Sequence, residues 1–186
     1  MTPILGILAS GMSGNLWAPG KDFDSIATTT VGAGGASSIT FSSIPQTYRH
    51  LQIRAIGRSS NTVEDSLYQF NGDVGAIYAH HLLVGNGSTA AAYATTSATS
   101  IKGAPYLTGN TSIFGAGVTD ILDYTNTNKY KTVRTLTGYD NNGGSFAQIQ
   151  FYSGLWQSTS ALTSITITPT AGTYVQYSQF ALYGIR

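Results

Sequence analysis

Apolar and polar residues alternate along this chain in short runs, separated by glycine, asparagine and proline. Leu51, Ile53 and Ala55 share one face of an extended segment, and Arg54 lies on the opposite face. This period of two is typical of a strand in an antiparallel sheet with one face buried. The same pattern recurs along the chain and no helical period competes with it, so we predict an all-β protein.

Nine further runs have strand character. They cover residues 23–31, 37–41, 66–70, 76–84, 114–124, 130–136, 146–156, 162–168 and 177–186. Turn residues lie between them: the glycines at 32–35 join the first two runs, and 126–128 and 139–144 are typical of hairpin turns, because Asn and Gly tolerate positive φ. About eight to ten strands with no convincing helix predict an antiparallel β-sandwich or jelly roll.

Two segments give weaker signals. Residues 88–110 are rich in Ala and Thr with little periodicity, so we expect a long surface excursion with weak strand or helix pieces. Residues 158–162 are compatible with one helical turn or with a loop. The sandwich domain is expected to span residues 21–186, which at this length buries enough surface to form one core without disulfides.

Residues 1–20 form a separate, apolar and glycine-rich segment without a globular pattern. The segment lacks the basic n-region of a signal peptide, and its apolar run is too short to cross a membrane. Exposed apolar residues usually mark an interaction site, so we expect an extended arm that docks into a groove on another protein, rather than a free tail. The expected contact residues are Ile4, Leu5, Ile7, Leu8, Leu16 and Trp17.

The amino-acid composition limits the classes of partner that we expect. Hydrophobic residues make up 41% of the chain and charged residues only 9%, against roughly 25% charged in an average soluble domain. A surface of hydroxyls, amides and glycine is suited to close packing with neighbouring proteins. The formal net charge of +1 gives no strong field for a polyanion, so nucleic acid is not the expected partner. The lack of cysteine excludes disulfide, thiolate and Cys-ligated metal chemistry.

The histidines do not predict a catalytic or metal site. His80 and His81 are adjacent, and neighbours on a strand point to opposite faces, so they cannot readily hold one ion together. His50 is distant in sequence. We expect one partly buried and one exposed imidazole at 80 and 81.

The carboxylates and glycines give similarly weak signals for catalysis. Asp120 and Asp123, or Glu64 and Asp65, could in principle form a glycosidase pair, but turn capping or solvation is the simpler interpretation. The serines lie in no Gly-x-Ser-x-Gly elbow, and the glycines at 32–35 lack the Lys of a phosphate loop. Short Asp and Asn clusters offer too few ligands for calcium. We therefore expect a protein that is not an enzyme, with no cofactor and no metal.

Twelve tyrosines and two tryptophans could stack on sugars or anchor protein contacts, because Tyr combines an apolar ring with a polar tip. We expect most of them to serve packing within the sandwich and contacts between subunits. Trp156, at the end of a strand, is expected to fill the core.

Three segments, 3–10, 123–134 and 180–185, resemble small virion structural proteins of tailed bacteriophages, and the resemblance covers nearly the whole chain. An arm followed by a jelly roll is similar to trimeric capsid decoration, or cement, proteins. The resemblance implies a homotrimer on the outer surface of the capsid, bound to the major capsid protein or another virion protein, and no membrane partner. It carries no catalytic motif.

Related sandwiches also occur in tail fibres, which leaves an alternative open. In it the arm attaches a receptor-binding module to the tail, and surface tyrosines and amides bind host carbohydrate. A glycan-cleaving enzyme ranks last, because a single Glu and scattered Asp give it little support.

Overall fold

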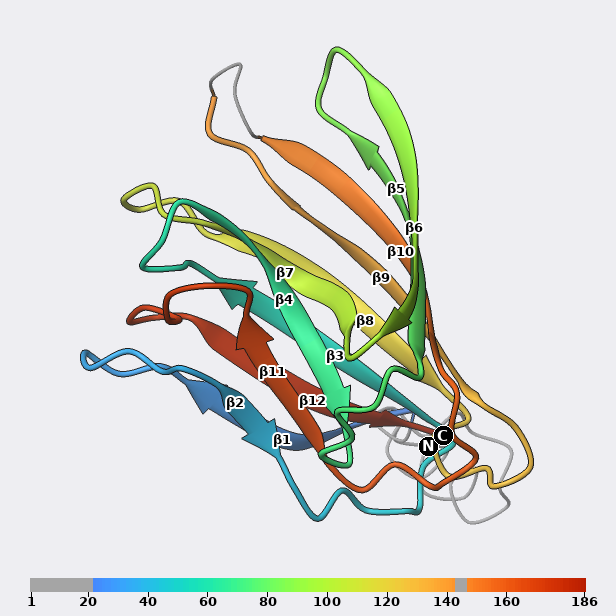
Figure 1. Cartoon of the computed structure of the whole chain (residues 1–186). Coiled ribbons are helices and arrows are strands. Elements are labelled where there is room, and N and C mark those ends of the chain that lie inside the picture. Colours follow the sequence, from blue (N-terminus) through green and yellow to red (C-terminus); the bar gives the residue numbers. More distant parts are fainter. Residues whose placement is uncertain (1–21, 143–146) are drawn as a thin grey trace, which may run out of the picture.

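The computed structural model describes residues 22–142 and 147–186, and in these residues the chain forms twelve strands and no helix (Figure 1). The strands build two antiparallel sheets. The first sheet contains β1 (Phe23–Thr30), β3 (His50–Gly57), β5 (Tyr78–Gly85), β6 (Ala90–Ala98), β8 (Gly115–Leu122), β9 (Lys131–Tyr139), β10 (Gln148–Trp156) and β12 (Gln179–Ile185). The second contains β2 (Ile39–Phe41), β4 (Val63–Phe70), β7 (Ile101–Thr108) and β11 (Ile165–Pro169).

The two sheets differ in width. The large sheet has eight strands in the order β1-β12-β3-β8-β9-β10-β5-β6, and the small sheet has four in the order β2-β11-β4-β7. The small sheet lies over one face of the large one, and β5, β6 and β10 extend past its edge strand β7 (Figure 1). Within the described residues, the small sheet therefore covers neither the outer face of the large sheet nor its overhanging end at β5, β6 and β10.

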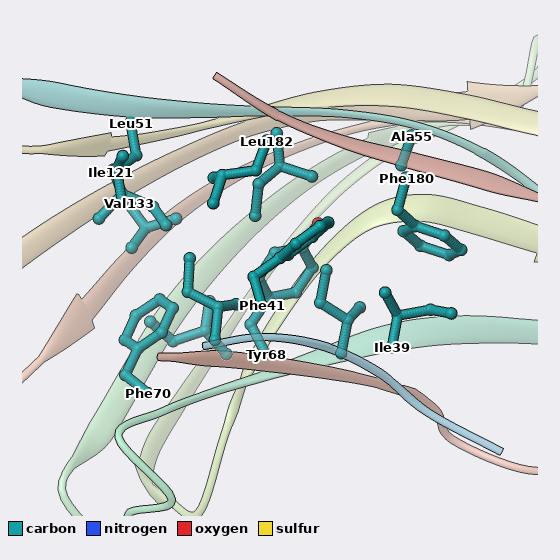
Figure 2. Close-up of a cluster of buried hydrophobic side chains, with 14 of the residues drawn as sticks. Ile39, Phe41, Leu51, Ala55, Tyr68, Phe70, Ile121, Val133, Phe180 and Leu182 are labelled. Carbon is teal, nitrogen blue, oxygen red and sulfur yellow. The ribbon is translucent and has the colours of Figure 1, made fainter. Parts of the chain in front are cut away.

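The core lies between the sheets, as the alternation in the sequence predicts. Leu51 and Ile53 of β3 are fully buried, as are Ile165 and Ile167 of β11, and all four belong to one hydrophobic cluster. Figure 2 shows Leu182, Ile121 and other apolar side chains of the large sheet above those of β2 and β4. The packing is that of two inner sheet faces that interdigitate.

Aromatic side chains fill one end of this core. Trp156 is 1% exposed, and its ring lies edge-on to Phe70 at 5.6 Å and stacks with Tyr78 at 6.4 Å. Its indole N–H donates to the Asp73 carboxylate at 3.3 Å. The expectation that Trp156 fills the core is confirmed.

Glycines on β8 allow β7 to lie close to the large sheet. A Cβ on Gly115 would overlap the carbonyl oxygen of Tyr106, and one on Gly117 would lie 2.6 Å from the Ala104 Cβ. Cβ atoms do not approach other atoms this closely, so the two backbones can meet only where β8 has no side chain. Seven of the eight residues of β7 are consequently buried.

Most predicted strands are confirmed within three residues at their ends, and one expectation needs correction. Residues 88–110 form two full strands, β6 and β7, rather than a surface excursion, which raises the number of strands in the described residues to twelve. The glycines at 32–35 join β1 to β2 along the chain, and the two strands enter different sheets, where β1 pairs with β12 and β2 pairs with β11. Of the two alternatives left open for residues 158–162, a helical turn or a loop, the structure shows the loop.

The described part of the chain contains no helix long and apolar enough to cross a membrane. The predicted arm at 1–20, and part of the turn predicted at 139–144, lie outside the described residues.

Candidate interaction surface

The large sheet exposes apolar side chains on its outer face, across β5, β10, β9 and β8. The strand register aligns Leu83 with Phe151, Phe151 with Leu136, and Leu136 with Val118. In the neighbouring row, Ile149 of β10 pairs with Gly138 of β9. The row continues through Ala116 of β8 to Ile56 of β3. We call Ile56, Leu83, Val118, Leu136, Ile149 and Phe151 the apolar band.

Five members of this band are strongly exposed. Ile149 is 60% exposed, Leu83 56% and Leu136 52%, and Ile56 and Phe151 exceed 40%. Single exposed apolar residues are common on protein surfaces, but a contiguous row across four strands is not. Two hollows of about 1000 and 430 Å³ lie along this face, so the band borders concave surface and not a ridge.

The same strands bury polar side chains on their inner face. Thr135 and Thr137 of β9 and Gln150 of β10 are at most 3% exposed, and they alternate with Leu136 and Phe151. Their hydrogen bonds are made inside the sandwich: Thr135 bonds the Thr119 hydroxyl at 2.9 Å.

Thr137 also contributes to this internal network. Its hydroxyl accepts from the Tyr106 N–H at 2.7 Å and donates to the Ala116 carbonyl at 3.0 Å. In the middle of the large sheet the usual rule of apolar inside and polar outside is therefore inverted on these strands. Because exposing Leu or Phe to water in place of Thr costs free energy, the inversion points to a surface that another molecule covers.

A polar row borders the band on one side. Gln52 donates to Asp120 at 2.8 Å and accepts from Arg54 at 2.8 Å, and Arg134 donates to the Ser153 hydroxyl at 3.0 Å. The charged side chains in this row are hydrogen-bonded to neutral neighbours in the sheet. An apolar centre beside a hydrogen-bonded polar margin is the usual anatomy of a protein–protein interface.

Among the described strands, β6 forms one edge of the large sheet and pairs with β5 alone. Its nine residues carry no charge, and all but Ala91 and Ala98 are exposed. Tyr93, at 61% exposure, is its only large side chain. Natural edge strands are usually protected by charges, proline or a covering loop, and β6 contains neither charge nor proline.

The carboxylates that could have formed a catalytic pair have structural partners. Asp123 bonds the Lys129 ammonium and lies 3.5 Å from the Arg49 guanidinium. The hydrogen bond from Lys129 holds the pKa of Asp123 below its ordinary value. Asp120 is bound by Gln52, on the outer face of β8. The arrangement fits the structural interpretation of both residues.

Glu64 and Asp65 also contact different partners. Glu64 accepts from the Asn61 amide at 2.6 Å and from the Thr170 hydroxyl. Asp65 lies 2.6 Å from the Lys102 ammonium and accepts from Tyr152 at 3.1 Å. The register shift in the β4–β7 ladder falls between Glu64 and Ser66.

His80 and His81 lie on opposite faces of β5, as expected. His80 is 6% exposed and packs edge-on against Tyr152, with ring centroids 6.0 Å apart, whereas His81 is exposed. Burial, together with the nearby Lys102 ammonium, lowers the pKa of His80 despite the opposing effect of Asp65. Among the described residues, no three His, Asp or Glu side chains gather closely enough to hold a metal ion.

The tyrosines mostly pack inside the sandwich. The buried ones are Tyr68, Tyr78, Tyr106, Tyr124, Tyr139, Tyr152 and Tyr174. Burial raises the pKa of Tyr78 and that of Tyr106 each to about 12, so both phenols stay neutral. Only Tyr93, Tyr130 and Tyr177 are strongly exposed among the described tyrosines, and they lie on separate segments.

No family model, curated protein or solved structure matches this chain. The surface must therefore be interpreted from its own residues.

Sequence reasoning placed the contact residues in the arm, at Ile4, Leu5, Ile7, Leu8, Leu16 and Trp17, and these lie outside the described residues. It did not identify the apolar band. The signal was present in the strand at 130–136, where Thr135 and Leu136 are neighbours of opposite character. Without the position of the second sheet, either residue could have been assigned to the core.

Proposed function

We propose that this chain is a non-enzymatic structural protein of a tailed-bacteriophage virion, and specifically a capsid decoration, or cement, protein. In this proposal a homotrimer binds the outer surface of the shell through its apolar band, and the arm at 1–20 links each sandwich to a neighbouring polypeptide. The observation that carries the binding role is the inverted pattern on β9 and β10, where Leu136 and Phe151 are exposed and Thr135 is buried. The phage context comes from the resemblance in the sequence.

The chemistry of the band defines the partner surface that it fits. The band has no charge, and the charged side chains beside it, Arg54, Arg134 and Asp120, are already hydrogen-bonded within the sheet. A matching surface is therefore apolar and uncharged at its centre, with polar groups at its margin. Several weak contacts of this kind on one trimer would add, because the linked copies raise the effective concentration of each other.

The test is binding to purified capsids from which the protein has been removed. The wild-type chain should bind, and a chain lacking residues 1–19 should remain folded but lose most binding. Leu136→Asp combined with Phe151→Asp should also lose binding, whereas Thr40→Asp, on the exposed face of β2, should bind like the wild type. Wild-type occupancy by both the truncated chain and the double variant would refute the proposal.

Copy number separates the capsid role from the tail alternative. Quantitative mass spectrometry of purified virions should find hundreds of copies per particle for a capsid protein and a few for a tail protein. The carbohydrate-binding alternative has fewer stacking platforms than the composition suggests, because seven of the twelve tyrosines are buried.

A further inference from the structure

The β6 edge offers a row of backbone donors and acceptors for another strand. In the β5–β6 hairpin the Asn86 N–H donates to the Thr89 carbonyl at 3.2 Å, so these two residues form a hydrogen-bonded pair. Hydrogen-bonded and non-bonded pairs alternate along an antiparallel ladder. The backbone groups of Ala91 and Tyr93 therefore point toward β5, and those of Ala92 and Ala94 point outward, away from the sheet.

The overhang beside this edge is apolar on both faces. Leu83 and Phe151 lie on the outer face, and Leu82 and Tyr93, which pair across β5 and β6, lie on the inner face. Leu83 and Tyr93 are more than half exposed. A strand added at β6 would meet apolar surface on both sides, so its own side chains should be apolar at consecutive positions instead of alternating.

The arm has this sequence pattern. Residues 3–9 read Pro-Ile-Leu-Gly-Ile-Leu-Ala, with no polar side chain. Consecutive apolar residues over such a length are typical of a strand buried on both faces. We infer that residues 3–9 of one copy add a strand to the β6 edge of a second copy. This inference deepens the proposed function, on which it rests for the role of the oligomer, by naming the polypeptide that receives the arm.

The position where the arm leaves the sheet favours a second copy over the chain's own edge. The described structure begins at Asp22, directly before β1, and β1 is the opposite edge of the same sheet from β6. Seven inter-strand spacings separate the two edges, about 34 Å. Residues 9–21 would need about three quarters of their full extended length, which is about 45 Å, to cross that face within one chain.

Between two copies, the arm does not have to cross the face of a sheet to reach a β6 edge. A neighbour placed with its β6 edge beside this β1 edge receives the arm directly. The contact joins two different surfaces, so repeating it gives a ring when the rotation closes, as a homotrimer requires. Strand addition of this kind uses main-chain hydrogen bonds for affinity and side-chain pockets for register.

The lack of cysteine makes a direct crosslinking test possible. One tagged chain carries Ile7→Cys and a second, differently tagged chain carries Ala92→Cys. After the two full-length chains are mixed, a short thiol-reactive crosslinker should join one of each, and the short spacer tolerates a slip of one residue. Thr40→Cys, on the small sheet, replaces Ala92→Cys as the control and should give no product with Ile7→Cys.

A further pair of variants tests the strand geometry. Ala94→Pro, added to the chain that carries Ala92→Cys, removes an outward-pointing N–H without removing a bond to β5. Crosslinking of that chain to the Ile7→Cys chain should become about tenfold weaker. Ala94→Val keeps the N–H and should crosslink like the parent. Circular dichroism of both variants verifies that the sandwich is intact.

Two outcomes would overturn the inference. One is an intramolecular link, without gain in mass, in a single chain carrying both cysteines. The other is an oligomer of unchanged mass after residues 1–21 are deleted, measured by light scattering. Capsid binding is read separately: arm exchange without capsid binding would refute only the virion role, and capsid binding by a monomer would refute only the arm exchange.

Discussion

The Tyr152 hydroxyl donates a hydrogen bond of 3.1 Å to the Asp65 carboxylate, which joins β10 of the large sheet to β4 of the small sheet. Asp65 also pairs with Lys102 at 2.6 Å, so one carboxylate connects three strands. Burial, followed by the nearby Asp65 charge, raises the pKa of Tyr152, and the phenol remains a neutral donor. This contact therefore ties the two sheets together beside the overhang.

Removing this hydroxyl should destabilise the fold. Tyr152→Phe leaves the ring in place but deprives Asp65 of a donor, and a hydrogen bond to a charged group contributes about 1.5–3 kcal/mol. We expect a loss of that size in the free energy of unfolding, measured by urea denaturation. Tyr130→Phe, at a 50% exposed position, should change it by less than about 0.5 kcal/mol. Equal effects of the two substitutions would contradict the prediction.

His80 should make stability depend on pH. Its folded pKa lies below the ordinary value of 6.5, because burial disfavours the charged imidazole. As pH falls through the unfolded value, the unfolded chain takes up a proton that the folded chain does not. The free energy of unfolding should therefore fall with pH below about 6.5 and level off below the folded pKa.

His80→Phe should remove this part of the pH slope while keeping a ring against Tyr152. The free energy of unfolding would be measured by urea denaturation from about pH 5 to pH 7.5. His81→Gln, on the exposed face of the same strand, controls for loss of a histidine. A slope that survives in full in His80→Phe would show that another group is responsible.

Lys131 is a buried cation bound by backbone carbonyls. Its side chain is fully buried, and its ammonium donates to Asn126 at 2.6 Å, Lys129 at 3.1 Å and Thr159 at 3.2 Å. Burial lowers its pKa. Lys131→Met removes the ammonium that donates to these three carbonyls and should cost about 2–4 kcal/mol of unfolding free energy. Lys129→Met, at an exposed ion pair, should cost about 1 kcal/mol or less.

Gly115→Ala should prevent the close approach of β7 to β8. The added methyl would overlap the Tyr106 carbonyl oxygen, and backbone must move to relieve the overlap. We expect a loss of more than about 3 kcal/mol, or an insoluble chain. Gly34→Ala, where a Cβ has open space around it, should behave like the parent in thermal melts.

The apolar band should tolerate charge in the isolated protein. Leu136→Asp places a carboxylate at a 52% exposed position, so the free energy of unfolding should change by about 0.5 kcal/mol or less. Val133→Asp, three residues earlier on the same strand and buried, should unfold the domain. If Leu136→Asp unfolds the domain as well, Leu136 belongs to the core and the band is not a free surface.

The sequence predicted the sandwich because most strands alternate clearly, as in β3, and because Asn126 and Asn128 mark the hairpin between β8 and β9. It missed β7 because both of its faces are buried, so the strand has no alternation to detect. It missed β6 because Ala-rich strands have low β-propensity, and pairing with β5 decides the conformation.

The interaction surface was harder to predict than the fold. Leu136 and Phe151 are exposed only because the small sheet packs on the opposite face of the large sheet. Similarly, β1 pairs with β12, which joins the first and the last described strands. Both facts depend on contacts between residues distant in sequence. Alternation within a strand gives two faces but does not say which of them is inside.

Because the large sheet is wider than the small one, β5, β6 and β10 extend past the region where the two sheets pack together. The hairpin tip at 86–89 is closed by its own contacts, since the Asn86 side chain accepts from the Ser88 and Thr89 N–H groups at 3.1 and 2.8 Å. A foreign peptide inserted between Gly87 and Ser88 would project from the overhang without disturbing the core. On a multi-copy assembly, this tip would serve as a ready position for displaying an epitope.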